Sequence, residues 1–352
     1  MKKLVKNIVF IVFPFAVVVM ICNYVIDAGN VFNNGKYEAK ITSILLKKHN
    51  AIGLFNFDER LVIKNIFTAI DTAPNVVVIG TSKVLGFSKN NFPNNSFRNC
   101  ALSKSTINDV IAEIGLFDSL HKFPKHIYIE TSPFLSAKTD QDTWLTLAEF
   151  HSNFINKLKI KNIETINNPN YYFIKRKLGA LISLEYFQKS LSNYKKSFNK
   201  KIIETDTNLV QQFGRYADGS ISYAKEFMVV DTAKQMANAK IFVSKEGNLE
   251  ISEIKLQALK IIVNYLKTKN VYVSLIMMPL QQDCYTLYNE NNLSIDILKN
   301  RFIDFAKENK IELIGNFNPK EINLFRSDFY DHIHCKSSVL NNVLHFVQYS
   351  PN

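Results

Sequence analysis

The feature that most constrains the fold is a run of β-branched apolar residues that ends in a turn of small residues. Residues 76–79 are all valine or isoleucine, and Gly80, Thr81 and Ser82 follow. A continuous apolar run bounded by turn residues predicts a strand buried on both faces, as in a parallel sheet. Open α/β sheets bind ligands at the carboxyl ends of such strands. Ser82 is therefore a candidate nucleophile if the fold also supplies a base and an acid.

The composition is that of a globular chain. Of 352 residues, 47% are apolar and 21% are charged, which suits one large domain or two small ones. Four cysteines without CxxC spacing argue against a zinc site and a disulfide framework. The net charge of +12 comes from dispersed lysines without a basic, aromatic-interleaved stripe, so nucleic-acid binding is not predicted. A solvated surface, an anionic envelope polymer or lipid headgroups fit this charge equally well.

The amino terminus has the pattern of a membrane anchor. Residues 7–26 contain no charged side chain, and a helix of that length reaches about 30 Å, the thickness of the hydrocarbon core. Pro14 is tolerated in membrane spans. Lys2, Lys3 and Lys6 precede the segment and Asp27 follows it, so the positive-inside rule predicts a cytoplasmic amino terminus. We predict a single-pass anchor over residues 1–27, in the bacterial cytoplasmic membrane, with the main domain outside.

Three other structures could account for the same apolar segment. A cleaved signal peptide needs a shorter apolar region and an A-x-A-like site, which is not found here. A lipoprotein cysteine at Cys22 would follow a small residue, and Ile21 is not small. A buried core helix is the remaining alternative.

The rest of the chain predicts an α/β domain behind a helical connector. Residues 28–70 form the connector, with helical apolar spacing at 37–48 and 59–70. Residues 71–352 form the domain, because predicted strands and helices alternate as in βαβ units with a parallel sheet. The strands are expected at 76–79, 96–102, 126–133 (ending in a polar turn), 271–279 and 311–314. The helices are expected at 107–120, 251–267, 295–307 and 337–347.

Residues 136–248 interrupt this alternation. The stretch 171–201 is basic, aromatic-rich and helix-compatible, and 214–220 is turn-like. We interpret the region as a helical insertion or cap. It either shapes a substrate groove or simply covers the sheet.

A base and an acid for Ser82 are available near the carboxyl end. A serine hydroxyl needs a base to take its proton, and a histidine base needs a carboxylate to hold its tautomer. Asp331 and His334 are three residues apart in a turn-rich stretch, which can place the carboxylate beside the ring. His332 competes with His334 for the role of base. Each signal alone is common, and only the fold can bring Ser82 to this stretch.

The combination of these motifs resembles the SGNH/GDSL hydrolase superfamily. The nucleophile turn is Gly80-Thr81-Ser82, and the closing stretch, residues 328–334, reads Asp-Phe-Tyr-Asp-His-Ile-His. The chain is more narrowly similar to single-pass bacterial members that modify cell-envelope polysaccharides. The resemblance implies a flavodoxin-like three-layer α/β/α sandwich with a parallel sheet. It also implies Ser82 as nucleophile, His334 as base and Asp331 as the orienting acid.

The resemblance is incomplete at the oxyanion hole. Members of the superfamily use the N–H of the nucleophile, a glycine after the second strand and often an asparagine after the third. This chain has no glycine in the second-strand turn and no Gly-x-Asn-Asp after the third strand. Removing one such donor costs about 100- to 1000-fold in rate. The residues that remain as candidates for oxyanion or substrate contacts are Asn99, Ser103, Ser105 and Thr131.

The leading functional hypothesis is an extracytoplasmic serine esterase or O-acyltransferase that forms an acyl-Ser82 intermediate. Its substrate would be a cell-envelope glycan or a lipid-linked acyl donor, and no metal or organic cofactor is implied. The alternative is a catalytically silent scaffold or glycan-binding module with the same fold. A third hypothesis is an acyl carrier partner of a multi-spanning acyltransferase.

Overall fold

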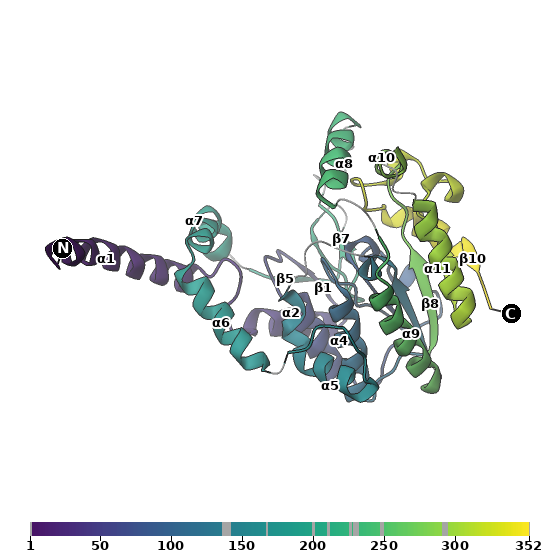
Figure 1. Ribbon diagram of the computed structural model, residues 1–352, viewed down its shortest axis with the longest axis horizontal. Coiled ribbons are helices and arrows are strands. Elements are labelled where there is room, and N and C mark those ends of the chain that lie inside the picture. The colour runs from purple at the N-terminus through teal and green to yellow at the C-terminus, as the bar shows by residue number, and fades with distance from the viewer. Residues whose placement is uncertain are drawn as a thin grey trace.

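The strand that precedes Ser82 lies inside a six-stranded sheet of an α/β fold. The computed structural model describes residues 2–135, 142–166, 168–198, 201–209, 212–224, 227, 232–246, 250–290 and 295–351 (Figure 1). The strands of this sheet occur in the order β10, β9, β8, β4, β2 and β3. Along the chain they are β2 (Val76–Ile79), β3 (Phe97–Asn99), β4 (His126–Glu130), β8 (Tyr272–Met277), β9 (Glu312–Gly315) and β10 (Val347–Tyr349).

The sheet is mixed but mostly parallel. The strands β3, β2, β4, β8 and β9 are parallel neighbours, and β10 pairs antiparallel with β9. Numbered along the chain, the five parallel strands are ordered 2-1-3-4-5. All five were predicted, whereas β10 was not. The predicted terminal helix is shorter than expected, because α12 (Leu340–His345) ends before this edge strand.

The two faces of the sheet are covered differently. Val77 and Ile79 pack into the larger core cluster with the long helices, while Val76 and Val78 point to the opposite face. The long helices are α3 (Glu59–Ala69), α4 (Ile107–Ser119), α9 (Glu253–Thr268) and α11 (Ile295–Asn309). The opposite core is closed mainly by short 3-10 turns and α12. The layer on the Val76 and Val78 face is therefore thinner than the layer of long helices on the other face.

A second, antiparallel sheet joins the connector to the insertion. Its strand order is β5, β1, β6 and β7. The connector supplies α2 (Lys36–Leu46) and β1 (Asn50–Ile52). The insertion supplies β5 (Ile203–Thr205), β6 (Gly214–Arg215) and β7 (Ile221–Ser222). The insertion, predicted as helical, also contains these strands. They are too short to show a period and are defined by pairing with β1 and with one another.

Along the chain, the helices of the insertion come before and after its three strands. They are α5 (Ala148–Leu158), α6 (Pro169–Ile182), α7 (Leu184–Phe198) and α8 (Thr232–Glu246), and α10 (Gln282–Glu290) follows later. The helical stretch expected at 171–201 is two helices, because Ser183 is extended, with φ −75° and ψ 125°. Parts of the predicted insertion, such as residues 136–141 and 228–231, lie outside the described residues.

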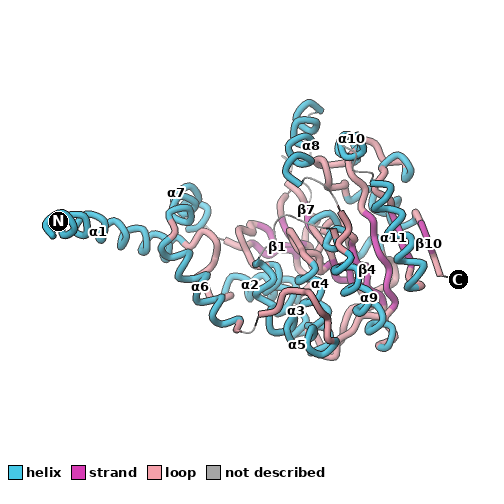
Figure 2. Tube along the Cα trace, viewed as in Figure 1, coloured by secondary structure: helices cyan, strands magenta, loops and turns pink. Residues whose placement is uncertain are grey.

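The amino-terminal helix α1 (Lys2–Ile26) extends away from the α/β body (Figures 1 and 2). Its carboxyl end packs against α6 and α7. Pro14 lies within the helix. Within the residues that the structure describes, no helix combines the length and the apolar character needed to cross a membrane.

Candidate active site

The turn after β2 is held by a buried carboxylate from the neighbouring strand. Glu130, at the end of β4, is fully buried and accepts hydrogen bonds from the backbone N–H groups of Thr81 at 3.1 Å and Ser132 at 2.9 Å. Gly80 has φ +154°, and a Cβ there would lie 2.4 Å from the Cβ of Glu130. A glycine is therefore required where β2 passes β4. This packing fixes Ser82 at the carboxyl end of the sheet.

The loop of Asp331 and His334 is built by local hydrogen bonds. Phe329 and Cys335 form an antiparallel bridge that closes the loop, and the Tyr330 N–H donates to the His334 carbonyl at 2.8 Å. Oδ1 of Asp331 accepts from the backbone N–H groups of the second and third residues after it, at 2.9 and 2.8 Å. Such a turn holds the carboxylate close to its own backbone. The second oxygen of Asp331 stays available for the histidine ring.

The fold brings the three predicted residues into one chain of hydrogen bonds. His334 Nε2 lies 2.8 Å from Ser82 Oγ, and His334 Nδ1 lies 2.7 Å from Asp331 Oδ2. Burial would raise the pKa of Asp331, but hydrogen bonds from the His334 ring and from the two backbone N–H groups outweigh it and hold the pKa at about 2. The side chains of His334 and Asp331 are 19% and 35% exposed. The aspartate is therefore ionised at neutral pH, and the pair is only partly exposed to solvent.

His332 points elsewhere. Its ring lies 4.5 Å from the ring of Phe242 on α8, centroid to centroid. Its Nδ1 is buried and has no hydrogen-bond partner among the described residues. Burial lowers the pKa of His332, and the charges of His334 and Lys83 add to that lowering, while Asp331 opposes it. The structure thus sets His334, and not His332, between the serine and the aspartate.

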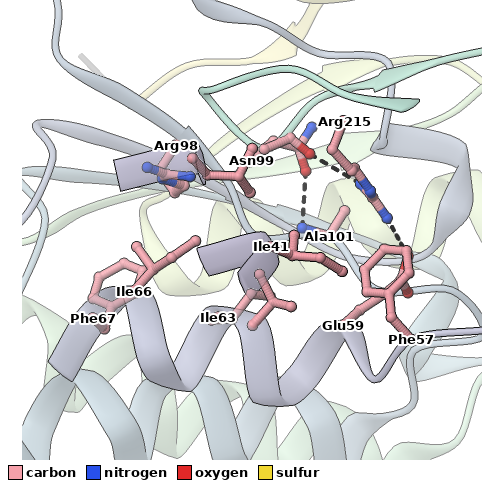
Figure 3. Close-up of a pocket in the computed structure, with 13 residues that line it drawn as sticks. Ile41, Phe57, Glu59, Ile63, Ile66, Phe67, Arg98, Asn99, Ala101 and Arg215 are labelled. Atoms are coloured by element: carbon pink, nitrogen blue, oxygen red, sulfur yellow. Dashed lines mark hydrogen bonds and ion pairs between the residues drawn. The ribbon is translucent and has the colours of Figure 1, made fainter. Parts of the chain in front are cut away.

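Asn99, a candidate from the second-strand turn, is committed to the backbone. Its side-chain amide donates to the carbonyls of Val84 at 2.8 Å and Phe87 at 2.9 Å, and its Oδ1 accepts from the Ala101 N–H at 2.9 Å. Figure 3 shows this residue beside a cavity of about 30 Å³, with the Arg215–Glu59 ion pair nearby. No residue of the Ser82 chain of hydrogen bonds lines that cavity. Asn99 therefore shapes the turns and has no free amide N–H for an oxyanion.

The other three candidates likewise have engaged backbone N–H groups. The N–H of Ser103 donates to Glu59 at 2.6 Å, that of Ser105 to the Leu102 carbonyl at 3.2 Å, and that of Thr131 to the Ile276 carbonyl at 3.0 Å. The hydroxyls of Ser105 and Thr131 are buried without partners among the described residues. None of the four is shown to contact Ser82 or His334.

Two possible oxyanion donors lie at Ser82 itself and at its neighbour. Ser82 begins a 3-10 helix, Ser82–Val84, where first N–H groups lack intrahelical acceptors. Within the described ranges its N–H has no acceptor. Lys83 Nζ donates to Ser132 Oγ at 2.8 Å, on the turn after β4, and has no carboxylate partner among the described residues. Lys83 directly follows Gly80-Thr81-Ser82 in the sequence. It was not singled out as a site residue, because a lysine is also common in an ordinary surface turn.

The insertion contributes aromatic side chains to the surroundings of His334. The ring of Tyr223, just after β7, lies 4.7 Å from Tyr330 and 6.2 Å from His334. Burial is the main reason that the pKa of Tyr223 is raised. Tyr223 could not be identified from the sequence, because its position beside His334 depends on the second sheet. Within the described parts of the chain, no cluster of three or more metal-ligating residues occurs.

Comparisons with protein-family models, with curated proteins and with solved structures found no match to this chain.

Proposed function

We propose that this protein is a serine acyl-ester enzyme of the SGNH/GDSL type, either an esterase or an O-acyltransferase. The observation that carries the proposal is the pair of contacts at His334, 2.8 Å to Ser82 Oγ and 2.7 Å to Asp331 Oδ2. These distances lie in the range in which a base can take the proton of a nucleophile. The strand order 2-1-3-4-5 also supports a flavodoxin-like fold, with Ser82 beside its switch point between β2 and β4.

The proposed reaction has two halves. Ser82 Oγ attacks the ester carbonyl while its proton moves to His334 Nε2, and Asp331 stabilises the imidazolium that forms. The tetrahedral intermediate collapses, the C–O bond to the leaving alcohol breaks, and His334 returns the proton to that alcohol. The acyl group then rests on Ser82. Water or a sugar hydroxyl, deprotonated by His334, takes the acyl group and restores the serine.

The developing oxyanion would be stabilised by hydrogen-bond donors that differ from those used in the superfamily. The Ser82 N–H is free of other acceptors among the described residues, and the Lys83 ammonium has donors beyond the one that binds Ser132. A cation beside a carbonyl that becomes negative lowers the barrier in a partly desolvated site. We therefore assign to Lys83 the electrostatic role that the missing asparagine has in related enzymes.

The proposed location is the outer face of the bacterial cytoplasmic membrane. The uncharged segment 7–26, with lysines before it and Asp27 after it, is the basis for this placement. The proposed substrate is a cell-envelope glycan or a lipid-linked acyl donor. An associated multi-spanning acyltransferase is a further proposed partner.

An active-site-directed fluorophosphonate tests the nucleophile. The wild type should be labelled, and Ser82→Ala should lose essentially all labelling. In the described residues Ser274 also contacts a histidine, His126, at 2.7 Å, but it is fully buried. Ser244→Ala is the matched control, since that hydroxyl only donates to the Ile241 carbonyl within α8. Equal labelling of the wild type and a folded Ser82→Ala protein would refute the proposal.

A second candidate, a catalytically silent glycan-binding module, is favoured by one observation. The backbone N–H groups of Ser103, Ser105 and Thr131 already donate to other acceptors. The side-chain amide of Asn99 is likewise hydrogen-bonded to the backbone. If this candidate is right, envelope glycan should bind equally well to the wild type and Ser82→Ala, and neither should release acyl groups. Turnover of an activated ester that depends on Ser82 would exclude it.

A further inference from the structure

The hairpin formed by α6 and α7 carries apolar side chains on its solvent side. Tyr171, Ile174, Leu178 and Ile182 on α6 are each 58–67% exposed. Their spacing of three, four and four residues puts them on one helical face. A helix of a soluble protein would normally bury such an apolar face against the core. More than half of the large hydrophobic side chains exposed in the described residues belong to α1, α6 and α7.

The second helix of the hairpin continues this surface. Leu184 and Leu191 on α7 are 55% and 48% exposed and lie two turns apart on the same face. Tyr194, 46% exposed, lies one turn further on. Leucine with tyrosine at the edge is typical of side chains that enter the boundary between headgroups and acyl chains. We refer to the exposed apolar residues of α6 and α7 together as the hairpin face.

Basic residues surround the hairpin face. Residues 169–198 contain six lysines and arginines and a single acidic residue, Glu185. Lys175 is exposed beside the apolar stripe of α6, and Arg176 is exposed on the side of α6 toward the connector. A cavity of about 570 Å³ between the hairpin and the connector is lined by Arg176 and Lys189. This charge is complementary to anionic headgroups, and not to a second copy of the same basic surface.

The hairpin is fixed to the carboxyl end of α1. The two hydrogens of the Asn23 side-chain NH2 are shared among three carbonyls, of Ala180 and Leu181 at 2.9 Å and of Ser183 at 3.0 Å. The Tyr186 hydroxyl donates to Asp27 at 2.8 Å. The exposed apolar surfaces of α1 and of the hairpin therefore lie at the same end of the molecule, away from the sheet (Figure 1).

We propose that the hairpin face binds the surface of an anionic lipid bilayer, with α6 and α7 lying in the interface. Amphipathic helices with leucine and aromatic residues on one side and lysine or arginine on the other bind in this way. The hairpin then sets the distance and tilt of the Ser82 site relative to the lipid surface. The proposal rests on the exposed side chains of the hairpin and not on the chemistry of Ser82, so the labelling experiment and this one fail independently.

Tryptophan quenching in reconstituted full-length protein tests the proposal. The chain has a single tryptophan, Trp144, which is 1% exposed and gives a constant background. Leu178→Trp is compared with the control Ile297→Trp, at a 68% exposed apolar position on α11. In vesicles containing anionic lipid with brominated acyl chains, Leu178→Trp should lose about twofold in added fluorescence, and Ile297→Trp should be unchanged.

Three results would overturn the proposal. The first is equal quenching of the two variants, which would mean that the hairpin face meets solvent or a protein partner instead of lipid. The second is quenching of Leu178→Trp that persists when zwitterionic lipid replaces the anionic lipid. The third is quenching unchanged by the added changes Lys175→Glu and Arg176→Glu, since each basic residue should strengthen surface binding about fivefold.

Discussion

The loop that carries Asp331 and His334 and the turns that follow β3 and β4 lie at the same edge of the sheet, yet they use their polar groups differently. In the loop, Asp331 satisfies its own backbone with one oxygen and keeps the other for His334. At the end of β3, Asn99 uses both amide hydrogens and its oxygen in hydrogen bonds to backbone groups. The first region is arranged for proton transfer, and the second is arranged to hold chain segments together.

This difference separates two kinds of polar residue that look alike in a sequence. A polar side chain at a strand end is as well suited to closing a turn as to contacting a substrate. What distinguishes them is whether a hydrogen-bonding atom remains uncommitted after the backbone is satisfied. Mutations in the two regions should therefore affect different quantities, catalysis in the loop and stability in the turns.

The largest expected effect is at His334. His334→Ala removes the base and should lower kcat for an activated ester by about 10⁴-fold or more. His332→Ala is the matched control, because it removes a neighbouring imidazole that packs on Phe242, and it should change kcat by less than about tenfold. Loss of activity in His332→Ala alone, measured on folded protein, would show that the geometry assigns the wrong histidine.

Lys83 tests whether the turn after β2 has taken over the oxyanion role. Lys83→Met should lower kcat by about 10²-fold with KM nearly unchanged, because the charge is needed in the transition state. Lys83→Arg should restore part of the loss. The exposed Lys89, six residues later, is the control. A change confined to KM would mean that Lys83 binds the ground-state substrate and does not stabilise the oxyanion.

Substitution of Asn99 should lower stability and leave catalysis nearly unchanged, the reverse of what is expected at His334 and Lys83. Asn99→Ala leaves the carbonyls of Val84 and Phe87 and the Ala101 N–H without their partner and should reduce the free energy of unfolding by about 2–3 kcal/mol. Activity per folded molecule should change by no more than about threefold. Chemical denaturation and active-site titration measure the two quantities separately. A large loss of kcat in stable protein would place Asn99 in the catalytic machinery after all.

The smallest expected effect is the contribution of the Asp331 carboxylate to the free energy of unfolding, which depends on pH. Its folded pKa of about 2 is below the ordinary value of 3.8, so its ionised form stabilises the fold above that value, and the stabilisation is lost as the pH falls toward 2. Because the carboxylate is 35% exposed, we expect only about 1 kcal/mol. Asp331→Asn should therefore be less stable than the wild type at pH 7, with a difference that shrinks between about pH 4 and pH 2. A difference independent of pH would contradict this assignment.

The sequence was informative where structure is local and periodic. Four of the five parallel strands and the helices beside them were predictable because each has an apolar run or a helical period of adequate length. The three-residue strand β3 lacks such a run and was expected only as a short strand within 96–102. Asp331 and His334 were predictable as a pair because a three-residue spacing in a turn nearly determines their contact. Their contact with Ser82 was an expectation from resemblance, and the structure supplies the distance.

The parts that were missed depend on pairing between distant segments. The strands β1, β5, β6 and β7 have only two or three residues each, so they carry no readable period. The place of Tyr223 beside His334 follows from that sheet. The role of Asn99 was missed for another reason, because its partners are backbone carbonyls that any residue could supply.

The second sheet also has a consequence for the order in which the chain folds. The Asn50 side chain accepts a hydrogen bond from the Ala217 N–H, 167 positions later, and β1 pairs with β5 and β6 across a similar separation. The connector cannot complete its structure until the insertion, as far as residue 217, is available to pair with it. Closing such a long loop is slow, and β1 is an unpaired edge until then. Folding should therefore pass through a stage with α2 and α3 formed and β1 open, when the chain is most prone to aggregation.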